Sequence, residues 1–190
     1  MKIKTQCITF HSLYASADGL ASGYGSRSMP LGKSNAVKEV KIKKGQIIQR
    51  KGDLNSKVYQ VESGLLRSYT IDTKGKEHIF MFAPEGWIIA DNVPPEQPCD
   101  LFIDALEDTI VIQRVKDFDS ELEAKKIIKR LGVLQKRVIM LMSAPAIERY
   151  ELFIQTYPDI VQRVPQKMIA SYLGITPQAL STLRAELARK

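Results

Sequence analysis

The sequence predicts an α+β chain in which an antiparallel β domain is followed by helices. Over residues 35–120, short apolar runs rich in β-branched and aromatic residues alternate with turn residues about every ten positions. After that point the apolar residues recur every three or four positions, which is the period of a helix. We therefore divide the chain into a tail (1–34), a β domain (35–120), a long helix (121–143) and a C-terminal helical domain (144–190).

Composition and charge narrow the class of protein. A hydrophobic fraction of 44% and a charged fraction of 26% are ordinary for a globular chain. No apolar run reaches the roughly 18 residues of a membrane span, so we expect no membrane partner. Two cysteines, Cys7 and Cys99, are too few for a disulfide framework or a four-thiolate cluster and are typical of a cytoplasmic protein. We expect no metal and no cofactor.

The net charge of +7 is concentrated in the C-terminal part. Residues 121–190 hold twelve basic and six acidic side chains, whereas residues 35–120 hold twelve and fourteen. This asymmetry predicts a polyanion partner for the C-terminal part, although a solvated basic helix gives the same count. The tail is rich in Ser and Gly without periodicity, which predicts a flexible segment.

The β domain is expected to be a small sandwich or barrel. Turn residues occur at Lys44-Gly45, at Gly52-Asp53 and around Gly64, which joins two strands of VYQVESGLLRSYTID. EHIFMF and DTIVIQRV supply further strands. The acidic stretch DALEDT, which contains Asp104, Glu107 and Asp108, is interpreted as an exposed turn rather than a catalytic cluster.

The long helix carries a seam of apolar residues with steps of four and three, which is typical of helices that pair. A helix packed on its own domain would show the same pattern over so few heptads. We expect the seam to form a dimer interface, made of Ile127, Leu131, Leu134, Val138 and Leu141.

The strongest local motif is PQKMIASYLGITPQALSTLRAEL, residues 165–187. Gly174 can end a first helix in the left-handed conformation, and Thr176 with Pro177 is a typical start for a second helix. Burial of Leu180, Leu183 and Leu187 would leave a polar face suited to DNA bases and phosphates. An αα-hairpin without a DNA role is the alternative. The predicted DNA-binding residues are Thr176, Gln178, Ser181, Thr182 and Arg184.

Residues 37–190 as a whole resemble the Crp/Fnr family of transcription regulators. The resemblance rests on KKGQIIQRKGD, VYQVESGLLRSYTIDTKGKE, FIDALEDTIVI, ERYELF and the 165–187 motif, in that order. It implies an antiparallel β-roll of the cyclic-nucleotide-binding type (cupin or jelly-roll-like), a dimerisation helix and a helix-turn-helix in a reduced winged helix. It also implies a homodimer on double-stranded DNA, with RNA polymerase as a further partner.

The resemblance places an effector pocket at Gly86, Trp87, Asp91 and Asp100, but the cyclic AMP contacts of the family are missing. No Gly-Glu pair follows Gly86, and Asp100 stands about where a phosphate-binding pair is expected. We therefore predict no response to cyclic AMP. His78 is expected to point outward from a hairpin, and Cys99 is expected to be an ordinary loop thiol rather than a redox sensor.

The predicted DNA-binding helix pair, residues 165–187 (the reader), also differs from the family pattern. Pro177 and Thr182 stand where relatives carry base-reading arginines, Gln178 replaces a glutamate, and no wing hairpin follows Leu187. A second hypothesis is therefore a small-molecule-binding or interaction module with a degenerate reader. No paired carboxylates, Cys/His, Ser/His or phosphate-loop motif stands out, so we expect no enzyme activity.

Overall fold

The computed structural model describes residues 38–116 and 121–189, without the side chains of residues 121–127, 129 and 130. The tail predicted as flexible, residues 1–34, lies outside the described residues.

Two four-stranded antiparallel sheets form the β domain, as the sequence predicted. Sheet A has the order β1-β8-β3-β6, with β1 Lys38–Ile42, β8 Thr109–Val115, β3 Lys57–Ser63 and β6 Ile88–Ala90. Sheet B has the order β2-β7-β4-β5, with β2 Ile47–Gln49, β7 Phe102–Ala105, β4 Leu66–Ile71 and β5 Glu77–Ala83. Val61 and Val111 from sheet A share one buried cluster with Leu66 and Ile103 from sheet B.

The turn between β3 and β4 requires Gly64. Its φ of +90° lies in the left-handed region, and a Cβ there would meet the Asp108 carbonyl oxygen and the Thr109 hydroxyl at 2.5 Å. The two strands predicted in VYQVESGLLRSYTID are therefore present and joined at Gly64, but they belong to different sheets and do not pair with each other.

The interpretation of DALEDT as an exposed turn was wrong for its first residues. Asp104 and Ala105 end strand β7, and Asp104 is only 7% exposed. Its carboxylate accepts two hydrogen bonds from Arg67, at 2.8 and 2.9 Å, and Arg67 also pairs with Glu77. The partner that allows this carboxylate to be buried lies 37 residues away, so a local turn pattern could not indicate it.

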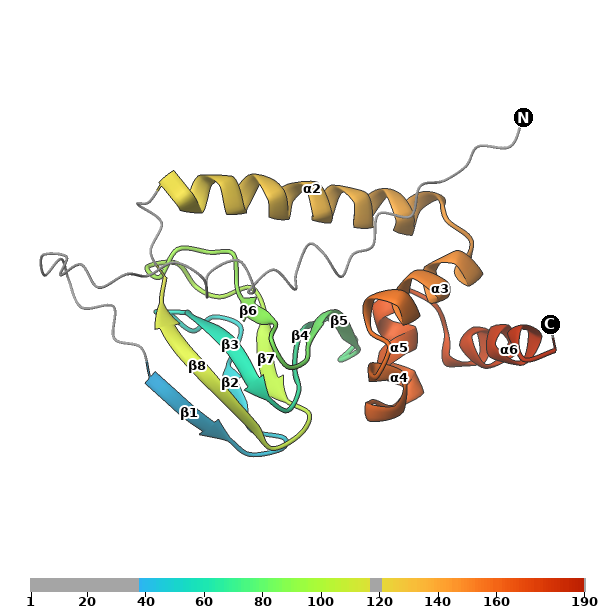
Figure 1. Ribbon diagram of the computed structural model, residues 1–190, viewed down its shortest axis with the longest axis horizontal. Helices are drawn as coiled ribbons and strands as arrows, with labels where there is room; N and C mark the ends of the chain where they lie inside the picture. Colours follow the sequence, from blue (N-terminus) through green and yellow to red (C-terminus); the bar gives the residue numbers. More distant parts are fainter. Residues whose placement is uncertain (1–37, 117–120, 190) are drawn as a thin grey trace, which may run out of the picture.

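Five helices follow the β domain in the described part of the chain (Figure 1). Helix α2, Glu121–Ser143, spans the range predicted for the long helix. Helix α3 is Ala146–Thr156, the short α4 is Ile160–Arg163, α5 is Gln166–Leu173 and α6 is Pro177–Leu187.

The helical domain shares its core with the β domain rather than standing apart. The Phe82 ring of β5 lies edge-on to Phe153 and Tyr157, with centroids 6.2 and 5.9 Å away, and 5.8 Å from Tyr172. The ring centroids of Trp87 and Tyr157 are 5.1 Å apart. These aromatic contacts join sheet B to α3 and α5 in a single buried cluster.

Candidate nucleic-acid interface

Helix α5 ends in the sharp turn that its sequence predicts. Gly174 has a φ of +68°, and the Ile175 N–H donates to the Ala170 carbonyl at 3.0 Å, which closes the last turn of the helix. Ile169, Ala170 and Leu173 are all 0% exposed. Ala170 is small enough to lie fully buried beside the turn, and α5 therefore crosses α6 closely.

Helix α6 begins at a side-chain cap. Thr176 is extended, and its hydroxyl oxygen accepts a hydrogen bond from the Ala179 N–H at 3.1 Å. Pro177 follows at the first helical position. Leu180 and Leu183 are buried at 0% and 6% exposure, while Leu187 is half-buried. The helix pair expected from residues 165–187 is therefore present.

The polar side chains of the predicted DNA-binding set lie on the outer surface of this pair. Gln178, Ser181 and Thr182 are exposed, and Arg184 is half-buried on the last turn of α6. Thr176 is exposed as well, but its hydroxyl oxygen already caps the helix. The small Ala179 and Ala185 are also exposed, so an approaching surface would meet no bulky apolar side chain on α6 at these positions.

Helix α5 is attached to the edge of sheet B by a contact that sequence reasoning missed. The Ser171 hydroxyl accepts a hydrogen bond from the Ile79 N–H at 3.0 Å and donates to the Glu77 carbonyl at 2.8 Å. Because β5 is an edge strand, these backbone groups have no strand partner on that side. A serine inside a helix gives no signal of such a contact in the sequence.

A second attachment is made by Arg163 of α4. Its guanidinium donates to Glu85 at 2.9 Å, to Glu107 at 2.7 Å and to the Gly64 carbonyl at 3.1 Å. The hydrogen bond that Arg163 donates to Glu85 lowers the pKa of this carboxyl group. These hydrogen bonds thus attach the helical domain to the β3–β4, β5–β6 and β7–β8 turns, and those to Glu85 and Glu107 are charge-assisted.

The structure divides the predicted dimer seam of α2 into exposed and half-buried residues. Leu131 and Val138 are 63% and 53% exposed, whereas Leu134 and Leu141 are half-buried, and the side chain of Ile127 lies outside the described residues. Leu134 and the buried Val133 face a junction with β5 and α5. The exposed apolar side chains of α2 are Ile128, Leu131, Val138, Ile139 and Met142.

The four residues predicted for an effector pocket lie close in sequence but have different surroundings. Gly86 is exposed at a turn, and the buried Trp87 ring lies against Tyr157. The Asp91 carboxylate is 4% exposed and accepts hydrogen bonds from the backbone N–H groups of Asp100 and Leu101 at 2.9 and 2.8 Å. The Asp100 side chain is exposed. Asp91 therefore organises the loop before β7, and the pocket stays a prediction.

Other candidate groups have simple environments. His78 is exposed, as expected, and its Nε2 lies 2.8 Å from Asp72. Cys99 is more buried than the expected loop thiol, at 2% exposure, and this burial raises the pKa of the thiol, which disfavours the reactive thiolate. Within residues 38–116 and 121–189, no three His, Cys, Asp or Glu residues group as metal ligands would. The helices described there are too short or too polar to cross a bilayer.

Known proteins resemble the chain in both sequence and fold. The family model described as "Cyclic nucleotide-binding domain" matches residues 39–117. The chain is 25% identical to the Anaerobic regulatory protein of Haemophilus influenzae and 27% identical to the Fumarate and nitrate reduction regulatory protein of Yersinia pestis, each alignment covering 75% of this chain. The structure of FixK2 from Bradyrhizobium japonicum has a TM-score of 0.68 at 22% identity, covering 81% of this chain and 85% of that one.

The chain is thus similar in sequence to these regulatory proteins and similar in fold to FixK2. It spans 63% and 65% of the lengths of the two curated relatives. The order of an antiparallel β domain, a long helix and a helix pair agrees with this relationship, which confirms the predicted fold class. The homologues are named as regulatory proteins rather than enzymes.

Proposed function

We propose that the chain is a transcription regulator that binds double-stranded DNA through α6. The observation that carries the proposal is the helix pair itself. Helix α5 is buried against the β domain, while α6 is buried along Leu180 and Leu183 and turns Gln178, Ser181 and Thr182 to solvent. Short polar side chains on an exposed helix are suited to base edges in a major groove.

The functional form is a homodimer that pairs through α2. Support comes from five exposed apolar side chains on one helix, Ile128, Leu131, Val138, Ile139 and Met142, because a monomer would leave this stripe in water. The four positions Ile128, Leu131, Val138 and Met142 follow steps of three, seven and four, which is a heptad pattern with Gln135 at one core position. The proposed interface keeps Leu131 and Val138 of the predicted seam and leaves out Ile127, Leu134 and Leu141. Of these, Leu134 faces the junction with β5.

Cyclic AMP is not the effector. Arg67, a buried arginine of sheet B, is already neutralised by Asp104 and Glu77, and Asp91 is occupied by backbone N–H groups. RNA polymerase is a further partner under this proposal, and the cytoplasm is its location. The competing function is a small-molecule-binding or interaction module with a degenerate reader. The small exposed residues Ala179 and Ala185 favour that alternative, since they offer bases little to contact.

The deciding experiment is selection from a pool of random duplexes, followed by titration of the selected site at several salt concentrations. A regulator should select a site with two related halves and should lose affinity steeply as salt rises. Absence of selection, together with weak binding to all duplexes, would establish the alternative. Light scattering at micromolar concentration should give a dimer, and replacement of both Leu131 and Val138 by Ser should give a folded monomer.

A further inference from the structure

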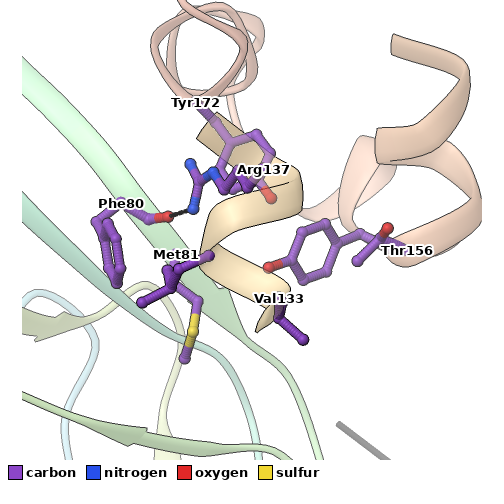
Figure 2. A pocket seen from close by; sticks show the side chains of 8 residues that line it. Phe80, Met81, Val133, Arg137, Thr156 and Tyr172 are labelled. Atoms are coloured by element: carbon purple, nitrogen blue, oxygen red, sulfur yellow. Dashed lines mark hydrogen bonds between the residues drawn. The ribbon is translucent and has the colours of Figure 1, made fainter. Parts of the chain in front are cut away.

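A small hollow lies where α2, α3 and α5 meet. It has a volume of about 10 Å³, opens to solvent, and is lined by Arg137, Met140, Arg149, Leu152, Phe153, Thr156 and Tyr172. A second hollow of about 20 Å³ shares Arg137, Thr156 and Tyr172 with the first and extends to Phe80 and Met81 of β5. Figure 2 shows Arg137 between Phe80 and Tyr172 at this junction. Two arginines therefore line the first hollow.

Arg137 is half-buried, and its contacts with the described residues are with uncharged groups. Its guanidinium lies 4.2 Å from the Tyr172 ring centroid and 5.3 Å from that of Phe80, and Nη1 donates to the Phe80 carbonyl oxygen. The guanidinium has five N–H donors, and this is the single hydrogen bond that it makes to the described residues. No carboxylate of the described residues forms an ion pair with it.

The hydrogen bonds of Arg149 are also with uncharged backbone groups. Its Nε donates to the Ala144 carbonyl at 2.9 Å and its Nη1 donates to the Leu173 carbonyl at 3.2 Å. Within the described part of the chain, no carboxylate pairs with this guanidinium either. Both arginines are half-buried, so each has lost part of the water that would otherwise stabilise its charge.

Two other arginines of this fold, Arg67 and Arg163, differ from Arg137 and Arg149 because they pair with carboxylates. Arg67 is paired with Asp104 and Glu77, and Arg163 is paired with Glu85 and Glu107, so that each guanidinium meets two carboxylates. A partly buried guanidinium is normally neutralised in this way, because an unpaired charge away from water is costly. Arg137 and Arg149 line one hollow without such a partner, and an anion from outside the chain would fill that role.

We propose that this hollow binds a small oxyanion, a carboxylate or phosphate group, held by the guanidinium groups of Arg137 and Arg149. Planar guanidinium groups match the oxygens of carboxylate and phosphate. The hollow has room for about one oxygen-sized group, so one oxygen enters and the rest of the anion lies in the mouth. The bound anion connects α2 to α3 beside the Leu173 carbonyl at the end of α5.

The test is a nuclear magnetic resonance titration of the arginine side-chain Nε–H signals in the full chain without DNA. The two probes are inorganic phosphate and acetate, each added at constant ionic strength against sodium chloride. Saturable shifts confined to Arg137 and Arg149 are expected with at least one probe, and the probe that saturates identifies the phosphate or the carboxylate class. Shifts spread evenly over exposed arginines, or no saturation with either probe, would overturn the proposal.

Two variants distinguish specific anion binding at this site from non-specific attraction to the basic surface. Arg149→Gln should weaken binding by about tenfold or more, as expected for the loss of charge-assisted hydrogen bonds. Lys136→Gln removes an exposed cation next to Arg137 on α2 and should leave the affinity unchanged. Equal weakening in both variants would mean diffuse attraction and no site. Should Arg149→Gln fail to fold, the wild-type titration decides alone.

Discussion

The two helices of the reader are joined by one turn but have different relations to the rest of the molecule. Helix α5 packs on α3, α6 and strand β5, and three of its side chains are completely buried. Helix α6 makes its principal contacts with α5, and it buries only Leu180 and Leu183. The two helices thus differ in their role in the fold: α5 holds the pair against the β domain, and α6 leaves its polar face exposed.

The largest expected difference between the helices is in stability. Leu173→Ala should lower the free energy of unfolding by about 2–5 kcal/mol, because it leaves a cavity in a core shared by both domains. Leu187→Ala, at the half-buried end of α6, should cost clearly less. Urea unfolding followed by circular dichroism measures both. Similar losses for the two variants would show that α6 is as firmly held as α5.

For DNA binding, in contrast to stability, we expect substitutions in α6 to have the larger effect. Gln178→Ala should cost about 1–3 kcal/mol on the best site and relax preference at one base pair, because its amide can pair with a base edge. Arg184→Ala, farther along α6, should weaken all sequences alike and reduce the salt slope by about one unit. Fluorescence anisotropy on selected and scrambled duplexes measures both effects. If neither variant alters binding while the fold is intact, α6 is not the reader.

A smaller effect is expected where α5 meets the sheet edge. Ser171→Ala removes the partner of the Ile79 N–H and the Glu77 carbonyl and should cost about 1 kcal/mol, because water can replace part of the loss. Amide hydrogen exchange should accelerate at Ile79. Ser181→Ala, on the exposed face of α6, is the matched control and should leave stability unchanged. Unchanged exchange at Ile79 would mean that α5 does not protect β5.

The smallest expected effect is the loss of stability at acidic pH. Arg163 lowers the pKa of Glu85 in the folded chain. The ion pair therefore stabilises the packing of the helical domain on the β domain when the pH is above 4.5, the ordinary pKa of glutamate. This contribution is lost as the pH falls below that value. Trp87 is the single tryptophan and lies against Tyr157, so its fluorescence reports on docking. A shift in emission is expected below that pH. Arg163→Gln should remove the pH dependence, and its persistence in this variant would assign it to other carboxylates.

Much of the fold follows from residues that act on their near neighbours. The left-handed glycines at 64 and 174, the Thr176 cap with Pro177, and the buried leucines of α6 all depend on contacts within a few residues or within one helix. Such features leave a pattern in the sequence, which is why the β domain, the bounds of α2 and the helix pair were predicted. The short helix α4 left no comparable pattern and was not predicted.

Tertiary structure decided which side of each element meets which partner. The burial of Asp104 depends on Arg67, the fastening of the helical domain depends on Arg163, and the division of the α2 leucines depends on how that helix lies against β5. These partners are 37 to 57 residues apart, or lie across the two domains. By itself the sequence determined the order and type of the elements, because those have local causes. Only tertiary packing, within sheet B for Arg67 and between α4 and the turns of the β domain for Arg163, decided which charges are neutralised within the chain.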